Sequence, residues 1–274
     1  MRFFDRLSLG WEIAMNSFKV IKENKQLLLF PVFSGLALLA ILATFVAGLF
    51  AASSVNVDNL PDEVDAVLLG TSLLFYFTCY FVILFFNVAL IHCTKMYFNG
   101  ETPTVRAGIA YSVTRIKAIL LWAFFAGTVS GVLKIIQENT GWVGRLISGL
   151  IGIVWSIATF FVVPVIAYEE TDPIQAVKRS SALMRENWGE SLGSAFSFGI
   201  IKVIAVVLIG MIAWLLSVIH PVVGIIAGGT GLLAVITVLS AAEVIFISAI
   251  YHRINGNPVE HFQEQLVQRL FEKK

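Results

Sequence analysis

Six long apolar runs constrain the fold of this chain more than any other feature. Each run is near or above the roughly 20 residues that an α-helix needs to cross a lipid bilayer. Their approximate limits are residues 27–52, 67–91, 118–136, 143–167, 194–218 and 222–250. The chain is 58% hydrophobic and only 14% charged, whereas about one-quarter of a soluble domain is charged. Since lipid cannot hydrogen-bond the backbone, these runs predict transmembrane α-helices.

The short connections between the runs predict how the helices pair. About residues 137–142 separate the third run from the fourth, and residues 219–221 separate the fifth from the sixth. Links this short make the joined helices antiparallel neighbours. The chain is therefore predicted to be a single integral membrane domain, residues 1–274, with an all-α transmembrane fold. We expect a six-helix bundle of three antiparallel hairpins.

Amphipathic segments flank the bundle at both ends. Within residues 1–26, apolar residues that include Trp11 and Phe18 recur at helical spacing. The tail, residues 251–274, places Phe262 and further apolar residues on one face in the same way. We expect the first segment to lie in the membrane interface or to pack on the cytoplasmic side of the protein. The tail is expected to lie on the membrane or against a partner protein.

The basic residues indicate the orientation of the chain. All but three of the 19 Lys and Arg residues lie in the N-terminal segment, the second and fourth connections or the tail. If the chain crosses the membrane six times, these four regions lie on the same side. The exceptions are Lys134, Arg145 and Lys202. The first connection, N-V-D-N-L-P-D-E-V-D, has four acids and no base. Both termini are therefore predicted to be cytoplasmic. The net charge of +1 gives no general attraction to nucleic acid.

A threefold plan is visible in the polar segments that precede the first, third and fifth runs. The sequence S-F-K-V-I-K-E-N at residues 17–24 matches S-S-A-L-M-R-E-N at residues 180–187 in its Ser, apolar, basic, Glu and Asn positions. The segment at residues 103–115 matches more loosely. The repeating unit is predicted to be an amphipathic helix followed by a transmembrane hairpin.

Two stretches of the chain resemble known sequences. They are G-W-E-I-A-M-N-S-F-K-V-I-K-E-N-K-Q-L-L-L-F-P at residues 10–31 and the polar stretch from Pro164 to Leu192. With them the chain resembles an uncharacterised family of six-span prokaryotic integral membrane proteins. The resemblance implies a multi-pass protein of the cell inner membrane, or plasma membrane. It supplies no catalytic residues.

The second stretch is also distantly similar to the membrane domain of some glycerophosphodiester phosphodiesterases. The residues that fit the pattern of that domain are Pro164, Glu169, Ala176, Ser180, Leu183 and Trp188. The soluble barrel that carries the hydrolase activity of those enzymes has no counterpart in this sequence. The resemblance therefore implies no such activity here.

Lys202 and Glu243 are charged residues inside apolar runs. A charge in such a position costs about 2.5–3.5 kcal/mol on insertion scales. Counted along two straight helices from the turn near residue 220, the two residues differ in depth by roughly 7 Å, which long side chains can close. We expect an intramembrane ion pair. It serves either as a structural pair, with Lys202 free to snorkel to the interface, or as a relay for protons or substrate.

Glu169, Glu170 and Asp172 form a polar cluster on the cytoplasmic side, directly after the fourth run. Clustered carboxylates can bind Mg²⁺ or act as acid and base. Asp172 directly precedes Pro173, and this order is typical of an N-cap followed by the first residue of a helix. Capping is the simpler interpretation of Asp172.

Small residues recur every four positions in three of the runs. They are Gly127 and Gly131; Gly144, Ser148, Gly152 and Ser156; and Gly224 and Gly228. Such stripes let helix backbones approach closely in a membrane. They predict helix packing inside the protein, and formation of a homo-oligomer through one stripe is the alternative.

No sequence motif for a cofactor, a metal or catalysis is present. The four histidines are His92, His220, His252 and His261, and none has metal-site spacing. Cys79 and Cys93 lie about 21 Å apart along one predicted helix, which is too far for a disulfide. We therefore expect no cofactor and no bound metal.

Three functional hypotheses remain. The leading one is a non-enzymatic membrane protein that organises lipid, or a membrane or cytoplasmic partner protein. The alternative is a small transporter or permease that uses Lys202 and Glu243. The third is a lipid-active enzyme that uses Glu169, Glu170 and Asp172. The substrate, the partner and the oligomeric state are not indicated by the sequence.

Overall fold

The described residues of the computed structural model form helices and contain no strand. They are residue 11 and residues 15–53, 63–169, 171–186 and 188–256. Much of the predicted N-terminal amphipathic segment, most of the tail and Glu170 lie outside them. The all-α prediction is confirmed for the described part of the chain.

Six of the helical segments are long and apolar enough to cross a membrane. They are Lys25–Ala51, Gly70–Phe98, Ile116–Asn139, Gly144–Tyr168, Gly199–Ile219 and Pro221–Ile254. Each contains most of one of the six apolar runs. The protein is therefore a multi-pass membrane protein, and its membrane helices imply contact with a lipid bilayer.

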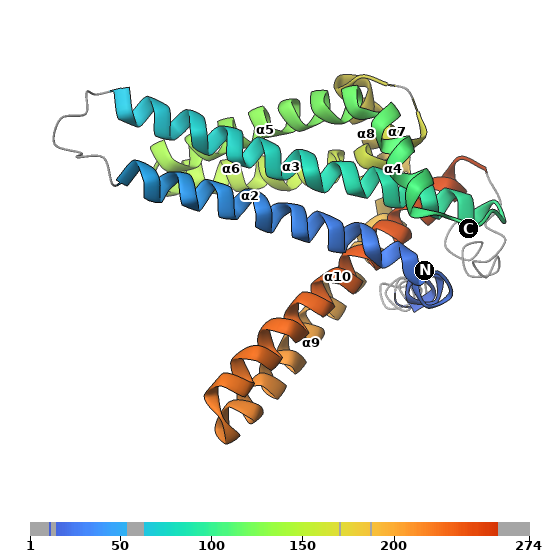
Figure 1. Ribbon diagram of the computed structural model, residues 1–274. Helices are drawn as coiled ribbons and strands as arrows, with labels where there is room; N and C mark the ends of the chain where they lie inside the picture. Colours follow the sequence, from blue (N-terminus) through green and yellow to red (C-terminus); the bar gives the residue numbers. More distant parts are fainter. Residues whose placement is uncertain (1–10, 12–14, 54–62, 170, 187, 257–274) are drawn as a thin grey trace.

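Four helices run side by side and form one part of the molecule (Figure 1). They are α2 (Leu29–Ser53), α3 (Glu63–Phe98), α5 (Ile116–Asn139) and α6 (Trp142–Ala158). Contacts join α2 to α3, α3 to α5, and α5 to α6. Neighbours in the chain are thus neighbours in space, as short connections require.

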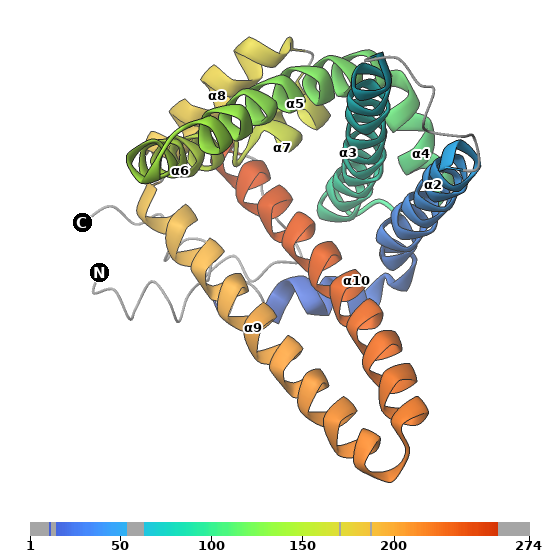
Figure 2. The same ribbon diagram turned by 90° about the vertical axis from the view of Figure 1, so that its left-hand side faces the viewer.

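The remaining two long helices form a hairpin that diverges from the other four (Figure 2). They are α9 (Trp188–Ile219) and α10 (Pro221–Ile254). The turn between them is His220, whose Nδ1 accepts a 3.3 Å hydrogen bond from the Val222 N–H at the start of α10. Pro221 is the first residue of α10, where its missing N–H is not needed.

Shorter helices gather where the four-helix part and the hairpin meet (Figure 1). They are the 3₁₀ helix η1 (Lys25–Leu28), α4 (Val105–Thr114), α7 (Val162–Tyr168) and α8 (Pro173–Glu186). The largest fully buried side chains include Leu27, Phe30, Phe98, Phe161 and Tyr251. The protein core therefore lies at this end, while the distal parts of the long helices expose apolar side chains.

The fourth run contains a break that the sequence analysis did not predict. A continuous helix was expected over residues 143–167, but α6 ends at Ala158 and α7 begins at Val162. In a continuous helix, Pro164 would lack the N–H for the carbonyl of Phe160, and its ring would clash with that carbonyl. The buried Ser180 Oγ of α8 instead accepts a 2.9 Å hydrogen bond from the Phe161 N–H. The interrupted turn is thereby stabilised.

The threefold plan has a counterpart in the structure. Helical residues 15–23, α4 and α8 precede the first, second and third hairpins. Each of these helices carries a fully buried serine: Ser17, Ser112 and Ser180. Ser112 Oγ donates to the Phe85 carbonyl at 2.9 Å, and Ser180 accepts from Phe161. A buried serine thus occurs in all three units.

Candidate functional site

A group of polar side chains joins α7, α8 and α10, and we call it the polar junction: Glu169, Arg179, Tyr251 and Asn255. Glu169 Oε1 accepts a 2.5 Å hydrogen bond from the Tyr251 hydroxyl and a 3.2 Å bond from Arg179 Nε. The Arg179 guanidinium also donates to Asn255 Oδ1 at 2.8 Å. Glu169 therefore lies at the centre of a hydrogen-bonded network rather than in an open acidic cluster.

Electrostatics keep Arg179 of the polar junction in its charged form. Burial lowers its pKa, but the hydrogen bond and negative charge of Glu169 outweigh this, so the pKa of Arg179 is raised above its ordinary value. The side chains of Arg179 and Glu169 are 42% and 38% exposed. Solvent therefore screens the pair, and its main effect is to position α8 against the end of α7.

Aromatic side chains pack beside the polar junction. The Tyr168 and Tyr251 rings lie 5.0 Å apart between centroids, and Lys95 Nζ lies 4.8 Å from the Tyr168 ring centroid. His252 is almost completely buried, with its ring 5.7 Å from Phe98 and 6.0 Å from Tyr168. This histidine lies in an aromatic environment, which its spacing in the sequence did not indicate.

A second set of contacts joins α3, α4 and α7. The His92 and Tyr111 rings stack with their centroids 3.9 Å apart. The Tyr111 hydroxyl donates to the Ala167 carbonyl at 2.5 Å and accepts from Arg115 at 3.0 Å. Tyr111 was not predicted from the sequence, because His92 and Ala167 come from two other segments.

The structure brings Lys202 and Glu243 together. Lys202 Nζ lies 2.6 Å from Glu243 Oε2, and their side chains are 42% and 38% exposed. The pair connects α9 with α10. Along the helices it lies roughly 26 and 33 Å from the turn at His220, about as far as the hydrocarbon core is thick. The charges therefore lie towards the end of the hairpin that meets the rest of the protein.

Asp172 has the role of a helix cap. Its Oδ1 accepts a 2.9 Å hydrogen bond from the Gln175 N–H, and Pro173 begins α8. Glu169 is engaged in the polar junction, and Glu170 lies outside the described residues. Within the described ranges, no three His, Cys, Asp or Glu side chains are grouped to hold a metal ion.

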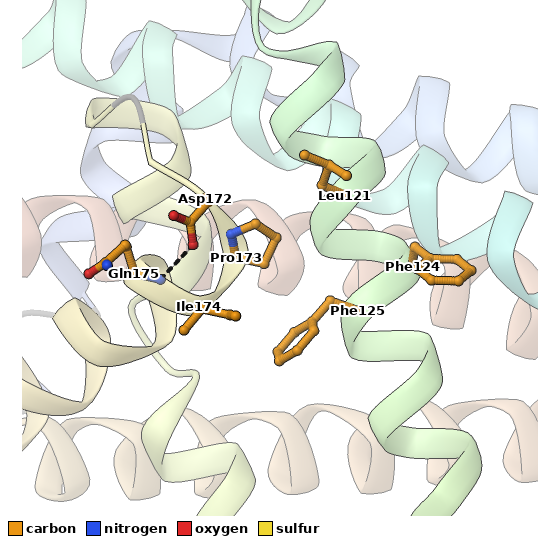
Figure 3. Close-up of a pocket in the computed structure, with 7 residues that line it drawn as sticks. All are labelled: Leu121, Phe124, Phe125, Asp172, Pro173, Ile174 and Gln175. Atoms are coloured by element: carbon orange, nitrogen blue, oxygen red, sulfur yellow. Dashed lines mark hydrogen bonds between the residues drawn. The ribbon is translucent and has the colours of Figure 1, made fainter.

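Asp172 also lines a cavity of about 400 Å³ between α5 and the start of α8, which we call the α5–α8 cleft (Figure 3). Leu121 and Phe125 project from α5 towards Pro173 and Ile174 of α8 (Figure 3). Phe124 and Gln175 complete the lining. The cleft is mainly apolar and has one carboxylate on its lining.

A larger cavity of about 570 Å³ lies between α3 and α5, and we call it the α3–α5 groove. Its α3 side consists of Leu73, Leu74, Tyr76 and Phe77, and its α5 side runs from Ala123 to Ile135. It contains Gly127 and Gly131, which were predicted to pack against another helix. Nothing lies within 4 Å of a Cβ built on either glycine. These two glycines therefore leave open space in the groove and do not form a helix–helix contact.

The other small residues differ in their surroundings. A Cβ on Gly224 would lie 2.5 Å from the Ser217 side chain, and one on Gly228 would lie 2.9 Å from Ala213, so α9 and α10 approach closely there. Gly144 faces the nearby Thr140 side chain. Ser148 is buried and donates to the Gly144 carbonyl at 2.9 Å. Gly152 has open space beside it, so the expected packing through this position is not seen.

Another close helix crossing involves a glycine that was not predicted from the sequence. A Cβ on Gly108 of α4 would lie 2.7 Å from Phe30, 2.8 Å from Cys93 Sγ and 2.9 Å from the Ala89 carbonyl. Cys93 is buried and donates to the Thr104 carbonyl at 3.2 Å. Gly108 and Ser112 are four residues apart, but they lie in the polar segment of residues 103–115, and small residues were compared only within the six apolar runs.

The fold defines a multi-pass membrane protein whose described residues are all-α. The chain belongs to a family of unknown function, DUF6159, which matches residues 66–263. No curated protein and no solved structure matches the chain. The comparisons show no link to the phosphodiesterase membrane domain that the second polar stretch resembles.

Proposed function

We propose that this protein is a non-enzymatic membrane protein that organises lipid or a partner protein in the inner membrane. The observation that carries the proposal is the nature of the two described cavities. The α3–α5 groove and the α5–α8 cleft are both largely apolar, and both open between helices at the outside of the bundle. Cavities of this kind suit the hydrocarbon part of an amphiphile.

The polar side chains support the same proposal. Glu169, Arg179, Tyr251 and Asn255 hydrogen-bond to one another. These contacts fix α8 against the ends of α7 and α10. Such an arrangement suits a rigid scaffold better than a site that must bind and release a polar substrate. We infer from the distribution of basic residues that the polar junction lies on the cytoplasmic side.

Transport through the Lys202–Glu243 pair is the second candidate function. The 2.6 Å contact between an amine and a carboxylate inside an apolar hairpin favours it, because charges at membrane depth often mark transport pathways. Two observations weigh against it. Each charge is already neutralised by the other, and neither of the two described cavities is lined by Lys202 or Glu243.

Cysteine accessibility separates the two candidates. In a variant with Cys79→Ala and Cys93→Ala, a cysteine is placed at Lys202 in one protein and at Glu243 in another. Membrane-impermeant thiol reagents are then applied from each side. The organising role predicts labelling from one side at most, since no water path crosses the hairpin. Labelling of the same position from both sides would contradict the organising role and favour transport.

A further inference from the structure

The α3–α5 groove and the α5–α8 cleft meet at one side chain. Phe124 lines both cavities and is 68% exposed. Along α5, the lining residues extend from Leu121 to Ile135, a length of roughly 21 Å. This exceeds the thickness of one hydrocarbon leaflet, about 15 Å. The two cavities therefore follow α5 over a length that suits a lipid acyl chain.

The chemistry of the lining changes along this path. In the α3–α5 groove the side chains are apolar apart from Tyr76 and Thr128, and Thr128 Oγ1 donates to the Phe124 carbonyl of its own helix. At the other end, the residues that line the α5–α8 cleft include Asp172 and Gln175. An occupant must therefore be apolar along most of its length and polar at one end.

The polar end carries negative charge. Both Asp172 and Gln175 are exposed, and only one carboxylate oxygen of Asp172 is used by the Gln175 N–H. An exposed carboxylate beside an apolar path favours a cationic amine and disfavours a second anion. Among bilayer components, this complementarity selects a headgroup that contains an amine.

We propose that the α5–α8 cleft and the α3–α5 groove together bind one amine-bearing, zwitterionic glycerophospholipid. One acyl chain lies in the α3–α5 groove over Gly127 and Gly131, and the headgroup amine lies near Asp172. This proposal rests on the proposed function and names the class of lipid that the protein organises. It also explains why the two glycines have open space beside them.

A helix of a second copy fits the same surface less well. A helix with its side chains is about 10–12 Å in diameter, and it needs a smooth, small-residue face to approach closely. Gly127 and Gly131 have bulky neighbours in the groove lining: Leu73, Leu74, Phe77, Phe124 and Val132. A flexible acyl chain can enter between these side chains. Dimer formation is nevertheless an outcome that the test must be able to reveal.

Native mass spectrometry of the full-length protein with defined lipids tests the proposal. The purified protein is incubated with an equimolar mixture of phosphatidylethanolamine and phosphatidylglycerol. Gly127→Leu fills the groove, and Gly152→Leu is the matched control, because both glycines lie in membrane helices with open space beside them. Asp172→Asn removes the proposed headgroup contact. Lys134→Gln, at the other end of α5, is its control.

The wild-type protein is expected to retain one phosphatidylethanolamine in preference to phosphatidylglycerol. Gly127→Leu should lower this adduct at least about tenfold, since excluding as few as two methylene groups has that effect. Gly152→Leu should leave it unchanged. Asp172→Asn should remove the preference for the amine lipid, and Lys134→Gln should not.

The following outcomes would overturn the proposal. They are equal loss of the adduct in both leucine variants, loss of headgroup preference in Lys134→Gln instead of Asp172→Asn, and a dimer that Gly127→Leu abolishes. If lipid binding survives in Gly127→Leu at full strength, the lipid is bound elsewhere. In that case the proposed organising function stands while this site does not.

Discussion

The two halves of α10 belong to one continuous helix, yet they lie in different surroundings. From Leu239 to His252 most side chains are buried, and Ala241, Ala242 and Ile245 have no exposed surface. From Val222 to Ile236 the large apolar side chains are mostly exposed, with Ile225 at 73%. Both halves are strongly apolar, so composition does not distinguish them.

The difference shows how the protein is held together. The second half of α10 lies where this helix meets α3, α7, η1 and α2, whereas the first half lies beside α9 (Figure 2). Protein side chains therefore stabilise the end at the polar junction, and lipid must cover the distal hairpin. Substitutions at the junction end should alter the folding free energy, and those in the distal hairpin should alter it little.

The largest expected effect is that of Gly108→Leu. The new side chain would collide with Phe30, Cys93 and the Ala89 carbonyl, which have no room to move in the core. We expect a loss of about 3 kcal/mol in the free energy of unfolding, measured by SDS-induced unfolding in mixed micelles. Gly229→Leu in the distal hairpin, with nothing within 4 Å, should cause no loss. Equal losses in Gly108→Leu and Gly229→Leu would show that the junction end and the distal hairpin do not differ in packing.

Ser180→Ala is expected to have the next largest effect. It leaves the Phe161 N–H without its acceptor at the break between α6 and α7. An unsatisfied buried donor costs about 2 kcal/mol. The neighbouring Ser181 is half-buried and bonds only to the Lys178 carbonyl of its own helix, so Ser181→Ala should cost much less. Similar losses for the two variants would show that the hydrogen bond does not stabilise the break.

Tyr251→Phe should cost about 1 kcal/mol, the usual net value of one hydrogen bond. It removes the contact with Glu169 but keeps the ring packed against Tyr168. Tyr76→Phe is the control, because Tyr76 is 51% exposed in the distal part of α3. The same unfolding assay checks both. If Tyr251→Phe leaves the free energy of unfolding unchanged, the polar junction does not stabilise the protein.

Glu243→Gln is expected to have the smallest effect, below about 1 kcal/mol. The amide can still accept a hydrogen bond, and the freed Lys202 can extend towards the nearby interface. The exposed pair of Lys134 and Glu138, 3.8 Å apart, sets the reference: Glu138→Gln should cost about 0.3–0.5 kcal/mol. A loss of several kcal/mol in Glu243→Gln would show that the pair is buried from both water and headgroups.

Much of the fold could be predicted because length and hydrophobicity determine membrane crossing. The six apolar runs correspond to the six helical segments that are long enough to span. The pairing of Lys202 with Glu243 also followed from counting residues on either side of one short turn. In both cases the decisive information lies within one segment or one hairpin.

Features that depend on contacts between distant segments could not be predicted in this way. Glu169 meets Tyr251, 82 positions away, and Gly108 crosses Ala89 of another helix. The divergence of the α9–α10 hairpin could not be predicted from the sequence either, because the same apolar side chains pack against lipid and against protein. The break before Pro164 could have been predicted from the sequence, because a proline inside a helix removes a hydrogen bond.

The organising function is tested most directly by native mass spectrometry of the protein released from its own membranes without exchange of lipid. The account predicts a stoichiometric lipid or a second protein bound to the chain. Retention of phosphatidylethanolamine in the wild type and its loss in Gly127→Leu would agree with the proposed groove. A bare monomer that carries neither lipid nor protein would contradict the organising role and leave transport through the Lys202–Glu243 hairpin as the better explanation.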